Sequence, residues 1–111
     1  MTLGRHYARA GADQNLIREA ADELRRSWDP SEEFTSPDGD CSAGAHARAI
    51  LGMLATGADF PIVKGYLRRA EEAALGEART TSAERRELVE KLWRMMAEVA
   101  IHNYKADPGS D

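Results

Sequence analysis

The sequence predicts an all-α fold: one compact four-helix bundle, with an apolar second helix as its hub and a long C-terminal helix. Apolar residues recur at helical spacing in three segments, a fourth segment is apolar on almost every side, and no segment alternates like a strand. The chain has 111 residues, a length that suits a single domain with a core of its own.

The breaks in the pattern define the domain organisation. Glycines interrupt residues 1–12, so we expect a flexible N-terminal arm there. Residues 13–106 are assigned to a single helical domain. Residues 107–111 are polar and are expected to form a disordered tail.

The first helix is predicted over residues 13–28. Asp13 suits the N-cap position, where a side-chain oxygen accepts a hydrogen bond from the first turn. Apolar residues fall on one face of this segment as far as Trp28, and charged residues fall on the other. The segment therefore has the pattern of an amphipathic helix that covers a core.

The second helix is predicted over residues 42–56, and Arg48 is its only formal charge. A helix that is apolar all round must be surrounded by protein, so we expect it to be the hub. Gly44 and Gly52 lie on the same side, and close approach of another helix would explain both. Gly57 provides a C-terminal stop.

The third helix begins at Asp59, an N-cap candidate followed by a proline in the first turn, and ends near Ala78. An apolar face is predicted from Ile62 to Ala74. The charged residues of this helix are expected on its solvent face: Lys64, Arg68, Arg69, Glu71 and Glu72.

The fourth helix is predicted over residues 82–105. Thr81 and Glu84 match a capping box, in which each side chain bonds the other residue's backbone N–H. The apolar residues of this helix cover more than one face, so it either lies between two neighbours or offers a surface to another chain. The second alternative predicts a homodimer through Met95 and Ile101.

Residues 29–40 are the longest break between helices, with two prolines, an Asp-Gly turn signal, five acidic residues and no basic one. Long irregular loops in compact domains are typically functional or disordered, and aromatic residues supply interface anchors. We expect this loop to bind a partner, with a solvated or disordered linker as the alternative. The expected partner-binding residues are Trp28, Asp29, Glu32, Glu33, Phe34, Asp38 and Asp40.

Arg48 has two possible roles in relation to this loop. Its stem can pack while its charged head reaches the rim of the bundle. Alternatively, a salt bridge from Arg48 to a loop acid would anchor the loop on the bundle, because a buried guanidinium needs a partner.

No motif for catalysis or cofactor binding stands out. Cys41 and His46, with Asp38 and Asp40 nearby, have metal-ligand chemistry, but their spacing is not that of a zinc site and no second pair follows. No phosphate-binding glycine motif or nucleophile elbow is present. We therefore expect no catalytic residues, no metal and no cofactor, and we place an enzyme last.

Charge and cysteine content narrow the class of partner. The net charge of −4 disfavours non-specific nucleic-acid binding and favours a basic protein partner. A single cysteine, with no signal peptide and no membrane span, suits a cytoplasmic protein.

The leading hypothesis is a small acidic protein–protein interaction module. It would be an inhibitor or accessory protein that docks on a larger, basic, nucleic-acid-handling partner, of the immunity, antitoxin or phage anti-defence type. The alternative is a helix-turn-helix-like nucleic-acid-binding regulator built from the second and third helices, which presents Lys64, Arg68 and Arg69. Neither hypothesis involves a membrane.

Overall fold

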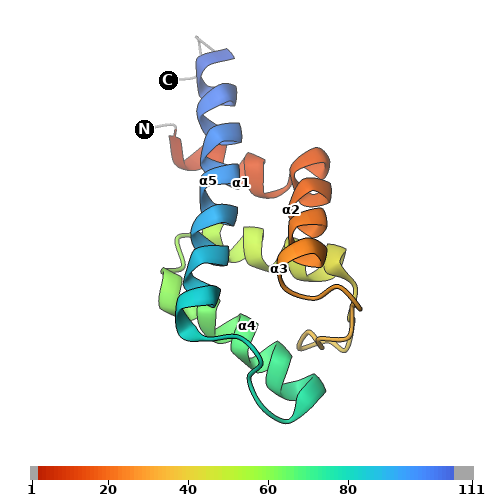
Figure 1. Cartoon of the computed structure of the whole chain (residues 1–111). Coiled ribbons are helices and arrows are strands. Elements are labelled where there is room, and N and C mark those ends of the chain that lie inside the picture. Colours follow the sequence, from red (N-terminus) through yellow and green to blue (C-terminus); the bar gives the residue numbers. More distant parts are fainter. Residues whose placement is uncertain (1–2, 107–111) are drawn as a thin grey trace.

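Five α-helices and their connections make up the structure, a computed structural model that describes residues 3–106 (Figure 1). The helices are α1 (Leu3–Gly11), α2 (Gln14–Ser27), α3 (Ala43–Ala55), α4 (Phe60–Leu75) and α5 (Ser82–Ala106). No strand occurs within this range, so the predicted all-α class is confirmed. The predicted tail at 107–111 lies outside the described residues.

The predicted count of four helices is wrong by one, because α1 forms where an arm was expected over residues 1–12. This helix packs against α3 and α5. Ala10 is buried, and the ring of Tyr7 stacks on Trp93 with 5.1 Å between centroids. A nine-residue helix is marginal on its own, so these tertiary contacts stabilise what the local sequence does not specify.

Local capping signals set the starts of α2 and α5 and the end of α3 as predicted, whereas α4 ends at Leu75 and not near Ala78, and the side chain of Asp59 makes no capping hydrogen bond. Asp13 Oδ1 accepts a hydrogen bond from the backbone N–H of Leu16 at 2.9 Å. Thr81 and Glu84 form both bonds of the capping box, at 2.8 and 3.1 Å. Gly57 follows α3 with φ of +91°, in the left-handed region that glycine adopts without strain.

The core lies where α3 and α5 meet the other helices. α3 runs across the long axis of α5 (Figure 1) and contacts each of the other four helices. α5 does the same, so the centre of the bundle is shared and the prediction of a single hub helix stays unconfirmed. The largest apolar side chains that are fully buried between the helices include Leu24, Ile50, Leu51, Leu67, Leu92 and Met96.

The glycines of α3 do not mark a close helix contact. A Cβ at Gly52 would meet no atom within 4 Å, and one at Gly44 would meet only the guanidinium of Arg48 at 3.8 Å. The close approach lies instead at Gly11, where a Cβ would be 2.8 Å from the Cβ of Ala55. The explanation expected from the sequence for Gly44 and Gly52 is therefore wrong.

Candidate binding surface

The loop between α2 and α3 (residues 28–42) is shaped by its own buried groups. The side chain of Asp29 is buried, and its two oxygens accept hydrogen bonds from the backbone N–H groups of Glu33 and Phe34, at 3.1 and 3.0 Å. A carboxylate that bonds backbone further along its own chain closes a turn. The N–H of Thr35 also donates to the carbonyl of Ala70 on α4, at 3.2 Å.

The two aromatic residues at this loop point inward. Trp28 and Phe34 are buried in an edge-to-face pair with 4.9 Å between ring centroids. The guanidinium of Arg79 lies over the Phe34 ring, 4.8 Å from its centroid. Together with the buried Asp29, these residues hold the loop on the bundle, which is at odds with the exposed partner contacts expected of them. The reason is that burying two large aromatic rings lowers the free energy of the fold more than leaving them exposed to water.

His46 joins the loop to α3 and α4. Its Nε2 lies 2.7 Å from the carbonyl of Phe34, and its Nδ1 lies 2.8 Å from the hydroxyl of Tyr66. A carbonyl only accepts, so Nε2 carries a proton, and in the neutral ring Nδ1 then accepts from Tyr66. Burial, followed by the charges of Asp38 and Asp40, raises the pKa of Tyr66 to about 12, which keeps that hydroxyl protonated as a donor.

Of the five loop carboxylates, Glu33, Asp38 and Asp40 are exposed. A hydrogen bond from the Ser36 hydroxyl lowers the pKa of Asp38, and the backbone N–H of Ser42 does the same for Asp40. Both are therefore ionised at neutral pH.

Glu32 has a structural role in the same loop. It is half-buried, and its Oε1 accepts from the backbone N–H of Ala43, at 2.8 Å, at the start of α3. The Nε of Arg25 lies 3.5 Å from that same oxygen. Negative charge at a helix N-terminus is stabilising, so Glu32 ties the loop to α3, whereas Glu33 is exposed.

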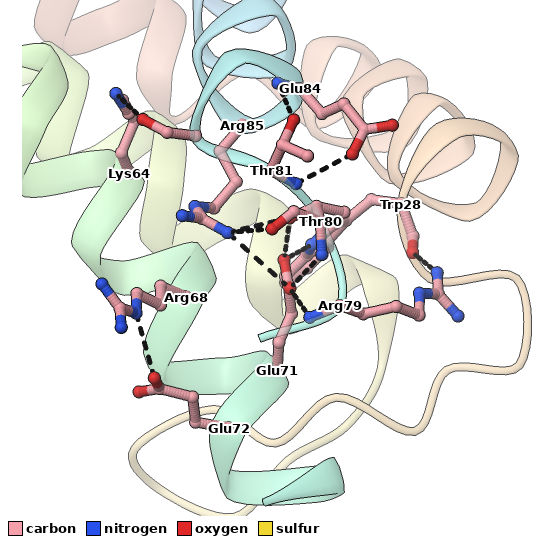
Figure 2. A network of polar contacts seen from close by, with 11 residues as sticks. Trp28, Lys64, Arg68, Glu71, Glu72, Arg79, Thr80, Thr81, Glu84 and Arg85 are labelled. Atoms are coloured by element: carbon pink, nitrogen blue, oxygen red, sulfur yellow. Dashed lines mark hydrogen bonds and ion pairs between the residues drawn. The ribbon is translucent and has the colours of Figure 1, made fainter. Parts of the chain in front are cut away.

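A second polar centre lies beneath the loop, around Glu71 of α4 (Figure 2). The carboxylate is 0% exposed. It accepts hydrogen bonds from Trp28 Nε1 at 2.7 Å, from the backbone N–H of Arg79 and of Thr80 at 2.7 and 2.8 Å, and from the Thr80 hydroxyl at 2.6 Å. Burial raises the pKa of Glu71, but these bonds outweigh it and the net direction is downward.

The position of Glu71 corrects the expectation that it lies on the solvent face of α4. The sequence contained the signal, because Glu71 follows Leu67 by four residues and so continues the apolar stripe from Val63. The buried carboxylate joins the end of α2 and the α4–α5 connection to α4. It is a structural centre that the sequence reasoning missed, as it missed the roles of His46 and Arg79.

Basic side chains gather on the other side of this centre, between α4 and the start of α5 (Figure 2). Lys64 Nζ donates to the Ser82 hydroxyl at 2.8 Å, and the buried Arg85 lies 4.0 Å from Glu71. With Arg68, these residues line a cavity of about 220 Å³. This cavity, the basic groove, brings three cationic side chains next to the N-terminus of α5. A helix N-terminus attracts anions.

Arg48 is exposed, and no ion pair joins it to any described residue. The exposure of Arg48 fits the alternative in which its charged head reaches the rim of the bundle. Asp29, Glu32 and His46 do the loop anchoring that the salt-bridge alternative assigned to Arg48. Cys41 is a half-buried free thiol.

Met95 is half-buried against the core, whereas Ile101 is 43% exposed. Of the two predicted self-association residues, only Ile101 is therefore displayed on the surface.

Within residues 3–106, no three histidine, cysteine or acidic side chains are grouped so that they could hold a metal ion. None of the helices in that range is long and apolar enough to cross a membrane. Comparison with family models, with curated proteins and with solved structures finds no match for this chain.

Proposed function

We propose that this protein is a small acidic interaction module that docks on a larger basic partner, as an inhibitor or accessory protein of nucleic-acid-handling machinery. One observation carries the proposal: the exposed carboxylates of Glu33, Asp38 and Asp40 lie on a loop whose backbone is held by buried groups. The charges are thus presented on a defined surface.

A fixed loop has physical advantages for binding. A segment that is already ordered loses less conformational entropy when a partner binds than a flexible one does. Clustered negative charge speeds encounter with a positively charged partner surface and suppresses wrong partners. A basic channel that normally holds nucleic acid has the complementary charge, which supports an inhibitor of the immunity, antitoxin or phage anti-defence type.

The test compares two triple variants of equal net charge. The loop variant is Glu33→Gln, Asp38→Asn, Asp40→Asn. The control is Glu19→Gln, Glu87→Gln, Glu98→Gln, which neutralises exposed acids on α2 and α5. The tagged protein is first used to capture a stoichiometric partner from nuclease-treated extract of the native cell, and the affinity of each variant for it is then measured against salt concentration.

We expect the loop variant to bind at least tenfold more weakly and with a flatter salt dependence, and the control to change little. Equal losses in both variants would mean that bulk charge, not this loop, drives binding. Unchanged affinity in the loop variant would refute the proposal.

The basic groove beside Glu71 favours a second candidate, a nucleic-acid-binding regulator. Lys64, Arg68 and Arg85 converge where a phosphate would also meet the N-terminus of α5. A salt-sensitive shift of labelled duplex DNA near physiological salt, weakened by Arg68→Gln, would support it. A captured partner that disappears on nuclease treatment would also place this candidate first.

A further inference from the structure

A cavity lies at the opposite end of α3 from the acidic loop. It has a volume of about 620 Å³ and is bounded by α1, the turn between α3 and α4, and α5. Cavities of roughly 300–1,000 Å³ are typical of binding sites. The proposed docking loop precedes α3 and this cavity follows it, so the two surfaces are separate.

Aromatic rings form one wall of the cavity. Tyr7 from α1 and Trp93 from α5 stack at 5.1 Å with 18° between their planes, and Phe60 at the start of α4 also lines the space. All three rings are half-buried, so each keeps part of its surface open. An aromatic face attracts a cation, and a planar guanidinium best of all, since it can also stack on the ring.

The other wall is negative. Asp59 lines the cavity and occupies the N-cap of α4, yet its side chain makes no capping hydrogen bond. Its carboxylate is exposed, and no ion pair joins it to any residue in the described range. Asp13, by contrast, uses its carboxylate to cap α2.

The C-terminus of α3 adds to this negative potential. α3 has no basic residue in its last turn, so the negative end of its dipole is not compensated. The N–H groups of Gly57 and Ala58 bond the carbonyls of Leu54 and Met53. No backbone N–H in the described part of the chain donates to the carbonyls of Ala55 and Thr56, two residues that line the cavity. They are further acceptors at the cavity for a ligand with several N–H donors.

We propose that this cavity binds an arginine side chain of the partner protein. The guanidinium would stack on the aromatic wall and donate to Asp59, a charge-assisted bond that lysine matches less well because its ammonium is neither planar nor forked. This inference rests on the proposed function, because the basic partner supplies the arginine. It adds an anchoring point on a face that the acidic loop does not reach.

The test uses the full-length protein and the tripeptide Ac-Gly-Arg-Gly-NH2. Binding is followed by the indole N–H signals in a nitrogen–proton NMR spectrum. We expect the Trp93 signal to move with a dissociation constant on the order of 1 mM. The Trp28 signal, whose N–H is bonded to Glu71 in the interior, should stay in place and acts as an internal control. The same peptide with citrulline, a neutral isostere of arginine, should bind at least about tenfold more weakly.

Three variants distinguish binding in the cavity from non-specific attraction of the peptide to negative charge. Asp59→Asn removes the charge at a position where asparagine is an equally good N-cap, and it should weaken the arginine peptide about tenfold. Ala58→Leu fills the cavity without changing the charge and should weaken it as well. Glu19→Gln removes the same charge from the exposed face of α2, outside the cavity lining, and should leave peptide affinity within about twofold, since exposed charges at a distance are screened.

The inference would be overturned by equal binding of the citrulline peptide, by unchanged affinity in Asp59→Asn, or by ethylguanidinium binding as tightly as the tripeptide. The last would make the cavity a site for free small cations. If the arginine peptide does not bind while the loop triple variant still has a weakened affinity for the captured partner, the cavity proposal is wrong and the proposed function stands. If the peptide binds but the loop variant retains its partner, the proposed function falls instead.

Discussion

Replacing Glu71 with glutamine should destabilise the fold by about 2–4 kcal/mol. Four donors converge on its two carboxylate oxygens: the Trp28 indole N–H, two backbone N–H groups and the Thr80 hydroxyl. A glutamine oxygen keeps the two backbone donors and sets its own NH2 group against the other two. The Thr80 hydroxyl can reverse its role and accept, but the indole N–H cannot.

The magnitude follows from this arrangement. One stranded buried donor costs about 1–3 kcal/mol, and the remaining bonds lose their charge assistance at roughly 1 kcal/mol each. Relief from burying a charge offsets part of that loss. The free energy of unfolding is measured in urea by far-ultraviolet circular dichroism, which reports the helices without relying on Trp28.

The matched control is the neighbouring Glu72→Gln, whose carboxylate bonds Arg68 at 3.0 Å near the surface. Such a pair contributes at most about 1 kcal/mol. In addition, Trp28→Phe removes the indole N–H that Glu71→Gln leaves without an acceptor. The double variant should therefore lose less free energy of unfolding than the sum of the losses in the two single variants. If Glu71→Gln lies within about 0.5 kcal/mol of Glu72→Gln, the reasoning on the buried network is wrong.

Three further predictions concern stability and assembly. Gly52→Ala should raise the free energy of unfolding by about 0.5–1 kcal/mol, because a Cβ there meets nothing within 4 Å. Gly11→Ala should lower the free energy of unfolding, because its Cβ would lie 2.8 Å from the Cβ of Ala55. Urea unfolding of both variants checks these two expectations. Burial raises the pKa of Glu23, but contacts with Ser27, Arg26 and Lys91 outweigh it, so that the pKa falls from 4.5 to about 2. A carboxyl whose pKa is lowered by folding stabilises the protein above its unfolded pKa, so the free energy of unfolding should fall as the pH drops from about 4.5 towards 2. Glu23→Gln should flatten that part of the curve of stability against pH. If the protein dimerises through its exposed α5 surface, Ile101→Glu should give a monomer by light scattering, and a wild-type protein that is already monomeric would contradict the dimer.

The starts of α2 and α5 and the end of α3 could be predicted because their signals are local. Asp13 and the Thr81–Glu84 pair each bond backbone within three residues, so the pattern in the sequence is the pattern in space. Gly57 needs only its own backbone freedom. α1 could not be predicted in the same way, because its stability comes from Tyr7 on Trp93 and Ala10 in the core, contacts that join opposite ends of the chain.

The sequence by itself determined an all-α chain, the ends of its four longest helices except the C-terminal end of α4, and an acidic loop between two of them, since composition, periodicity and capping act over a few residues. Only the tertiary structure decided which acidic side chains face solvent. Glu71 and Glu33 have the same chemistry, yet one is buried under converging donors and the other is exposed. The donors come from Trp28 and from Arg79 and Thr80, which lie apart from Glu71 in the sequence. Burial of a charge depends on partners that only the folded chain brings together.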